Sequence, residues 1–449
     1  RATGKRHPFL IRYDVGFDGA GRILALDLLL ASNGGNVADH SPAVMTRALC
    51  HSDNCYWLPN LRFRGYCCRT NTVSNTAFRG YGGPQGMIAI ETIIDQIARH
   101  LGLQNDDIRR ANYYGAAPNN ITPYRMPVED NIIEQAMSEL AADVKLKDWR
   151  AAVDAFNRDN TILKKGLATM PVKFGISFNR PALNQAGALV HVYTDGSVLL
   201  NHGGTEMGQG LFIKVAQVVA ETLQVDIDKI RVSATSTAKV PNTSPTAASS
   251  GSDLNGMAAL NAAEQIKARM TTVAAAHFKA QEDEIVFSAN RVYAGNRSIS
   301  FPELAQISWE SRVSLSAAGY YKTPKINWDF ETGTGRPFYY FVYGAAASEV
   351  VIDTLTGEMR VLRAELLQDC GKSLNPSIDL GQIEGAFVQG MGWLTSEELW
   401  WDSEGRLKTH GPSTYKIPGS RDVPPVFNVR VLGNAPNREA TVFRSKAVG

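Results

Sequence analysis

The residues best suited to chemistry lie in a glycine-rich stretch at 202–210, HGGTEMGQG, which contains four glycines. Because glycine has no Cβ, the backbone there can press against a ligand or turn through positive φ. Apolar residues then recur at helical spacing, which predicts a helix that starts near Leu211. A helix N-terminus offers free N–H groups to an anion, and Gln209 adds an amide that donates and accepts. An ordinary turn between a strand and a helix fits the same pattern.

Three other loops of glycine or small residues also precede predicted helices. They are 77–86 (AFRGYGGPQG), 241–252 (PNTSPTAASSGS) and the segment ending at Asn375, a predicted N-cap followed by Pro376. The first loop lacks the G-x-G-x-x-G register of a dinucleotide site, and the second also fits a flexible linker. Four such loops suit one large polyanionic or heteroaromatic cofactor. Since the chain has no G-x-S-x-G, H-E-x-x-H or Walker motif, the cofactor is expected to carry the difficult step.

The elements that must hold these loops are both strands and helices. Hairpins are predicted near 9–30, 188–201 and 348–367, where apolar residues alternate around turns rich in glycine and aspartate or threonine. A helix is predicted over 375–394. Its expected buried face consists of Leu380, Ile383, Phe387, Gly390 and Leu394.

The organisation predicted from these elements is an α+β fold of two domains. Residues 116–130 contain three prolines and read as a linker or crossover, and a helical segment follows them. We therefore place a domain boundary near residue 145, which gives domains 1–145 and 146–449.

Composition excludes several classes of function. The 449 residues are 44% hydrophobic with a formal net charge of +2 and no charged block, so nucleic-acid binding is not expected. No apolar run is long enough to span a bilayer, and no signal peptide opens the chain, so no membrane partner is expected. The five cysteines include no C-x-x-C pair, which argues against zinc or iron–sulfur sites in this chain and favours a cytoplasmic protein.

Six motifs, in order along the whole chain, resemble the molybdenum-binding subunit of the xanthine dehydrogenase family. They are FRGYGGPQ (78–85), LNQAG (183–187), HGGTEMGQG (202–210), PNTSPTAAS (241–249), GQIEGAFVQG (381–390) and SKAVG (445–449). One glycine loop alone would be unspecific, whereas six ordered matches are specific. The resemblance implies two elongated mixed α/β domains with the molybdenum cofactor cleft at their interface.

The resemblance also implies the cofactor and its neighbours. In this family the dithiolene of a pyranopterin (molybdopterin), rather than a protein side chain, holds molybdenum. Gln209 is expected to place its amide near the molybdenum oxo group, while Gly208 and Gln382 contact the pterin. The residues expected beside the metal and pterin are Arg79, Ala247, Ala248 and Ser249. Of these, Arg79 and Ala248 lie next to molybdenum without ligating it.

The activity implied by the resemblance is hydroxylation of purines, from hypoxanthine or xanthine to uric acid, with oxygen taken from water. Such enzymes serve purine catabolism and pass electrons to 2Fe-2S clusters and FAD on a partner domain or subunit. In the full enzyme the resemblance implies a homodimer of heterodimers. A molybdenum hydroxylase for aldehydes or another N-heterocycle, or a non-catalytic module that holds the cofactor or assists assembly, stays open as an alternative.

Substrate choice is expected to depend on Arg47, which by similarity faces a purine carbonyl and is also a catalytic candidate. A cation there would stabilise negative charge that builds on the ring. Tyr81 and Phe178 match the aromatic positions that sandwich the ring, and Asn179 and Leu183 complete the expected substrate set. A surface ion pair for Arg47, and plain core packing for the two aromatic residues, are the competing interpretations.

The chain departs from the family pattern in two respects. Asn179-Arg180 stands where a small or polar residue followed by an apolar one is usual, and Tyr81 stands in place of phenylalanine. The family's catalytic glutamate, a general base, is expected directly after Gly449, and an upstream glycine loop is also missing. We therefore expect a truncated piece that is inactive alone and without bound cofactor, since a positioned base contributes roughly 10²–10⁴ in rate.

Overall fold

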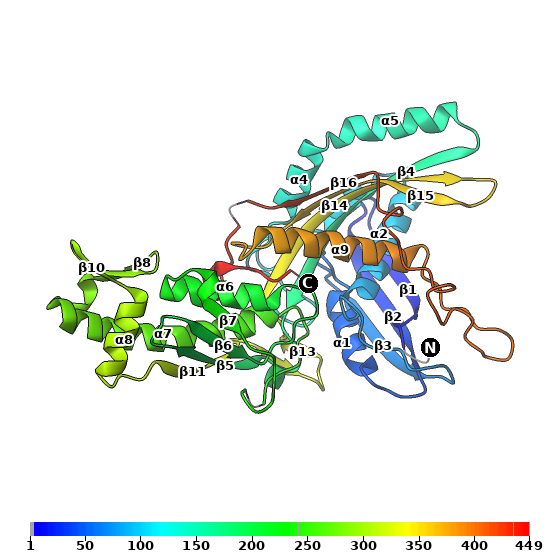
Figure 1. Cartoon of the computed structure of the whole chain (residues 1–449). Helices are drawn as coiled ribbons and strands as arrows, with labels where there is room; N and C mark the ends of the chain where they lie inside the picture. Colours follow the sequence, from blue (N-terminus) through cyan, green and yellow to red (C-terminus); the bar gives the residue numbers. More distant parts are fainter. Residues whose placement is uncertain (1–3, 241, 434, 449) are drawn as a thin grey trace.

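The computed structural model describes residues 4–240, 242–433 and 435–448. Figure 1 shows helices α6–α8 with their strands on one side and the first sheet on the other, while helix α9 runs between them. The α+β fold predicted from the sequence is confirmed, because helices pack on several separate sheets of mixed strand direction.

The first sheet has the order β1-β2-β3 and carries α1 and α2. Strand β2 pairs antiparallel with β1 and parallel with β3. Glycines bring the two helices together, since a Cβ on Gly82 or Gly86 would lie 2.1–2.2 Å from a main-chain oxygen of α1. The bounds are β1 Phe9–Phe17, β2 Ile23–Gly35, α1 Ser41–His51, β3 Leu61–Arg69, α2 Gly83–Leu101 and α3 Asn105–Asn112. This close approach sets α1 against the loop that precedes α2.

The second sheet has the order β16-β15-β14-β4. Strand β14 pairs antiparallel with β4 along its whole length, and β15 pairs parallel with β16. Helix α4 packs on β14, α5 on β4 and α9 on β16. The bounds are α4 Ile133–Asp143, α5 Leu146–Asp159, β4 Leu163–Ile176, β14 Tyr340–Asp353, β15 Met359–Gln368, α9 Pro376–Leu394 and β16 Val426–Val431.

The third sheet has the order β11-β5-β6-β7 and is covered by α7, which in turn packs against α6. A small sheet, β10-β9-β8, and helix α8 extend this side, and β12 pairs with β13. The bounds are β5 Gln185–Val192, β6 Val198–His202, α6 Leu211–Leu223, β7 Ile230–Val232, α7 Gly251–Phe278, β8 Ile285–Ser288, β9 Arg291–Ala294, β10 Arg297–Ser300, α8 Phe301–Glu310, β11 Ser316–Lys322, β12 Asn327–Asp329 and β13 Thr334–Arg336.

The buried cores do not follow the chain in simple blocks. The first core, under α1 and α2, is completed by Phe338, Phe341 and Tyr343 from the later part of the chain. Another core unites Leu140 of α4 with Trp149 of α5, on either side of the boundary predicted near residue 145. The division into 1–145 and 146–449 therefore stays a prediction.

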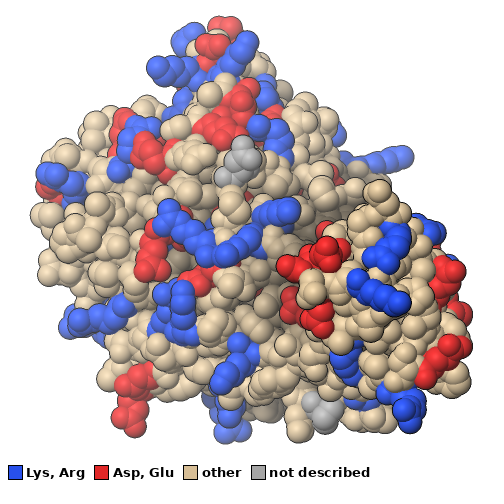
Figure 2. Space-filling model, turned by 90° about the vertical axis from the view of Figure 1, so that its left-hand side faces the viewer, with Lys and Arg blue, Asp and Glu red and all other residues tan. Residues whose placement is uncertain are grey.

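The local predictions have mixed outcomes. The hairpins near 9–30, 188–201 and 348–367 are confirmed as β1–β2, β5–β6 and β14–β15. The helix at 375–394 is confirmed, but its predicted buried face is wrong: among those residues only Ile383 is buried, and Leu394 is 63% exposed. Within the described residues, no helix combines the length and apolarity needed to cross a membrane. Figure 2 shows acidic and basic side chains interspersed over one face.

Candidate functional site

The structure joins the four loops that the sequence singled out. The Thr205 N–H donates to the Thr246 hydroxyl at 2.8 Å and so links the loop before α6 to the loop before α7. Gly210 packs so closely on Ile378 of α9 that a Cβ would lie 2.8 Å from its side chain. Arg79 in the loop before α2 donates to the main-chain oxygen of Gln382 in α9. The loops therefore form one continuous wall, with α9 between them.

The N-terminus of α6 is already occupied by a side chain of its own loop. The Glu206 carboxylate accepts the N–H groups of Gly208, Gly210 and Phe212 at 2.8–3.0 Å. Burial disfavours the ionised form, but these N–H donors outweigh it and lower the pKa of Glu206. The expectation of free N–H groups at this helix end is therefore wrong, because an internal carboxylate takes the place of an anion.

The N-terminus of α9 is capped as predicted. The Asn375 side-chain oxygen accepts the Ile378 N–H at 3.1 Å, and Pro376 is the first helical residue. Lys214 of α6 reaches the Asp379 carboxylate in the first turn of α9, and both side chains are buried. A buried pair of this kind is costly to break, so it fixes α9 against α6.

The N-terminus of α7 differs from those of α6 and α9. Ala248 and Ser249 adopt φ of 57° and 56°, a left-handed conformation that costs roughly 1–3 kcal/mol per non-glycine residue unless neighbouring structure holds it. The side chain of Ser250, the N-cap residue, accepts no hydrogen bond from the first-turn N–H groups of α7 in the described part of the chain. Successive N–H groups in such a turn point toward an anion or a polar ring. This is the loop end that best fits a ligand.

Gln209 does not reach out of its loop. Its amide oxygen accepts the Met207 N–H at 2.6 Å, and its amide nitrogen donates to the Thr205 carbonyl at 2.8 Å. Gly208, with φ of +97°, has open space where a Cβ would lie. The expected contact of Gln209 with the metal's oxo group stays a prediction, and in this structure the side chain stiffens the loop.

Arg47 is buried, not a partner in a surface ion pair. Its Nη1 donates to the Gly175 carbonyl at 2.8 Å, its Nη2 to the Ser177 carbonyl, and its guanidinium lies 5.2 and 5.0 Å from the ring centres of Phe174 and Phe338. Burial lowers its pKa to about 10, so it stays a cation at neutral pH. Main-chain carbonyls accept from two of its five N–H groups.

The remaining substrate candidates lie around the turn after β4, with Tyr81 nearby in the loop before α2. The Tyr81 hydroxyl meets His40 Nδ1 at 2.6 Å, which supplies the partner that a phenylalanine would not need. The Phe178 N–H donates to Asn184 Oδ1, and the Phe178 carbonyl accepts from Asn184 Nδ2. Leu183, the residue before Asn184, is half-buried. The Asn179 amide nitrogen is buried without a partner among the described residues, and Arg180 is exposed. Asn179 is therefore an unsatisfied donor, while Arg180 faces solvent.

Lys446 of the SKAVG motif is held by buried acidic residues that the sequence analysis did not single out. Lys446 Nζ contacts Asp369 at 2.6 Å, Asp130 at 3.2 Å and the Phe341 carbonyl at 3.1 Å. The main-chain N–H of Lys446 donates to the Cys370 carbonyl at 2.8 Å. Single aspartates such as Asp130 and Asp369, far from Lys446 in sequence, give no signal of such a cluster. Gly449, after which a general base was expected, lies outside the described residues.

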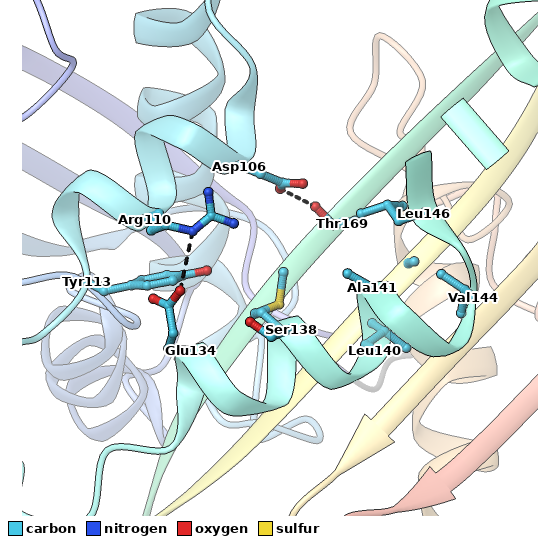
Figure 3. Close-up of a pocket in the computed structure, with 12 residues that line it drawn as sticks. Asp106, Arg110, Tyr113, Glu134, Ser138, Leu140, Ala141, Val144, Leu146 and Thr169 are labelled. Atoms are coloured by element: carbon cyan, nitrogen blue, oxygen red, sulfur yellow. Dashed lines mark hydrogen bonds and ion pairs between the residues drawn. The ribbon is translucent and has the colours of Figure 1, made fainter. Parts of the chain in front are cut away.

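Two observations bound where a ligand could sit. Among the described residues, no group of three His, Cys, Asp or Glu side chains could hold a metal ion. A cavity of about 260 Å³ opens between α3, α4 and strands β4 and β14, with the Arg110–Glu134 pair at its rim (Figure 3). None of the predicted site residues lines it.

Comparison with known proteins places all four loops of the wall inside regions that match family models. Two models described as molybdopterin cofactor-binding domain match residues 1–113 and 139–424. The chain is 48% identical over 447 residues to a xanthine dehydrogenase/oxidase of Felis catus and 48% identical over 450 residues to a xanthine dehydrogenase of Dictyostelium discoideum. Both matches cover 100% of this chain but 32% of the relative, so the chain spans about a third of their length.

The solved structures show that the fold is shared more widely. The chain matches quinoline 2-oxidoreductase from Pseudomonas putida 86 with a TM-score of 0.84 at 23% identity, over 100% of this chain and 58% of the other. It matches a Cu,Mo-CO dehydrogenase with a TM-score of 0.84 at 22% identity, over 99% of this chain and 57% of the other. At these identities the likeness concerns the fold.

Proposed function

Because this chain belongs to the molybdopterin cofactor-binding domain family, we propose that it forms the cofactor- and substrate-holding part of a purine hydroxylase. The proposed reaction takes hypoxanthine or xanthine to uric acid. Full-length coverage at 48% identity to xanthine dehydrogenases supports this substrate class. The observation that carries the proposal is the continuous wall of four loops, which leaves the first turn of α7 open.

The residues of this wall fit a large pterin cofactor. Arg79 would lie beside it, with its Nη2 held by Gln382 of α9, and Gly208 would let the cofactor approach the backbone without a clash. Ala247, Ala248 and Ser249 would offer main-chain N–H groups at the α7 end, and Gln382 would present its amide. When bound, the molybdenum cofactor supplies the two-electron oxidation that protein side chains cannot perform.

Arg47 would orient the purine and stabilise the charge that develops on it. Its bonds to Gly175 and Ser177 hold the guanidinium rigidly, so little reorganisation is needed when a carbonyl oxygen of the ring approaches. The unpaired Asn179 amide would donate a hydrogen bond to the substrate edge. Tyr81 and Phe178 would restrict the ring plane, and Leu183 would exclude water.

The proposal extends to the whole protein. Electrons would pass to an iron–sulfur and FAD partner, the assembly would be a homodimer of heterodimers, and the location would be the cytoplasm, in purine catabolism. The five free cysteines are compatible with a reducing compartment. The catalytic base expected after Gly449 stays a prediction.

The deciding experiment measures molybdenum content and turnover in the natural protein that carries this chain. We expect about one molybdenum per chain and uric acid formation from xanthine, with oxygen derived from labelled water. Turnover of aldehydes or quinoline but not purines would favour the alternative hydroxylase. Folded natural protein that contains no molybdenum and turns over none of these substrates would favour a non-catalytic module.

A further inference from the structure

A single tyrosine hydroxyl connects the 445–447 segment to the first turn of α7. The Ala447 N–H donates to the Tyr340 hydroxyl oxygen at 2.8 Å. The Tyr340 O–H in turn donates to Asp253 Oδ2 at 2.7 Å. The three residues are all buried, and Tyr340 lies 87 positions after Asp253 and 107 positions before Ala447, so the hydroxyl joins three separate parts of the chain.

Each end of this connection belongs to a different part of the proposed site. Asp253 lies in the first turn of α7, four positions after Ser249, the second of the strained residues Ala248 and Ser249. Ala447 follows Lys446, which is anchored by Asp369 and Asp130 under the end of the second sheet. Val442, just before this segment, packs on α7 beside Gly256. For residues 445–447 themselves, the Tyr340 hydroxyl supplies the hydrogen-bonded link to α7 within the described residues.

The surroundings make the Tyr340 hydroxyl difficult to replace. Asp253 Oδ1 is buried and has no partner among the described residues, so the Tyr340 hydroxyl is the hydrogen-bond donor on which this carboxyl depends. The other titratable or charged groups that face it are Lys214 of α6, Tyr321 of β11 and Tyr339 beside β14. Lys214 itself is paired with Asp379, so it is not free to take over the role of the hydroxyl.

We propose that Tyr340 is a positioning residue whose hydroxyl sets the separation between the 445–447 segment and the α7 end of the cofactor site. The inference rests on the proposed function only in assigning both parts to that site. The coupling itself is a property of the folded chain, and it can be measured without cofactor or substrate.

The test is amide hydrogen–deuterium exchange on the natural protein that carries this chain, read in the peptides that contain Ala447 and Asp253. Tyr340→Phe removes the hydroxyl with little change of shape and is expected to speed exchange at Ala447 about tenfold, because its N–H loses a buried acceptor. Asp253→Asn keeps an oxygen acceptor for Tyr340 and is expected to retain the wild-type protection. Asp253→Ala should raise exchange at Ala447 about threefold.

Tyr114→Phe is the matched control, since the Tyr114 hydroxyl also donates to a buried aspartate, Asp53, at 2.6 Å. It should lower the melting temperature without changing exchange at Ala447. Unchanged exchange in a folded Tyr340→Phe chain, or an equal rise with Tyr114→Phe, would overturn the proposal. If Tyr340→Phe does not fold, wild-type protection in Asp253→Ala has the same meaning. Lack of molybdenum in the natural protein that carries this chain would instead count against the proposed function alone.

Discussion

Arg79 Nη2 donates to the main-chain oxygen of Gln382 at 3.0 Å and lies 3.4 Å from its side-chain oxygen, across 303 positions of sequence. The stronger contact therefore goes to the backbone of α9, which no substitution of Gln382 removes. The loop before α2 is tied to α9 by the arginine, while most of the Gln382 amide remains free for a ligand.

This relationship predicts different effects for the two residues. Arg79→Lys loses the planar guanidinium and should lower the free energy of unfolding by about 1 kcal/mol. The same change should also reduce the amount of cofactor that the protein retains. Gln382→Ala should leave the melting temperature within a degree or so while molybdenum per chain falls severalfold. Thermal melts and metal analysis of the natural protein measure both effects. Equal loss of stability in the two variants would show that Gln382 is structural.

Replacing Arg47 should affect both stability and substrate choice. Arg47→Ala leaves two buried carbonyls, of Gly175 and Ser177, without their donor, so we expect a loss of roughly 2–4 kcal/mol of stability. In the natural protein, purine kcat/KM should collapse while aldehyde turnover, if present, survives. Phe338→Leu is the control, because it loosens the same surroundings but keeps the cation. If the ratio of purine to aldehyde kcat/KM shifted equally in Phe338→Leu, Arg47 would not be a substrate-binding residue.

Substituting alanine for either of two glycines in the 202–210 loop should lower the stability of the chain, for a different reason in each case. Gly208→Ala meets open space but must adopt φ of +97°, so a cost of about 1 kcal/mol is expected. Gly203→Ala would place its Cβ 2.0 Å from Thr243 Oγ1 and should cost more. Adding Thr243→Gly should recover stability in the Gly203→Ala chain but not in the Gly208→Ala chain. Chemical denaturation measures these differences, and recovery in both chains would contradict the steric explanation.

The stability of the chain should fall with rising pH through the titration of Asp253. Burial raises the pKa of Asp253 from 3.8 to about 7, against the opposing effects of the Tyr340 hydrogen bond and Lys214. Between these values the unfolded chain has released the proton and the folded chain has kept it, so higher pH favours unfolding. The stabilisation is complete below pH 3.8 and is lost as the pH rises through about 7.

Asp253→Asn removes this dependence. Over pH 5 to 8, the wild type should lose roughly 1–3 kcal/mol relative to the variant in urea titrations. Asp195→Asn provides the control: hydrogen bonds from the Ser197 hydroxyl and N–H lower the pKa of Asp195, so its titration lies below this pH range. Parallel stability curves for wild type and Asp253→Asn would show that Asp253 is ionised throughout.

Local sequence signals predicted local structure well. The Asn375 cap and the first-turn Pro376 were recognised because both depend on neighbours within three residues. The antiparallel pairing of β5 with β6 followed from alternation around a short turn. The same reasoning failed for the burial of α9, since burial depends on what packs against a helix and not on its own stripe of apolar residues.

The sequence by itself determined the family resemblance, the α+β class, the hairpins and the loops that form the site. Only the tertiary structure decided which helix ends are open to a ligand. Glu206 fills the end of α6 and Asn375 the end of α9, whereas no side chain of Ser250 satisfies the first turn of α7. The physical reason is that a glycine-rich spacing fixes where the backbone can turn. Which donor meets which acceptor depends on side-chain conformation and on contacts such as Arg79 with Gln382, between residues far apart in the chain.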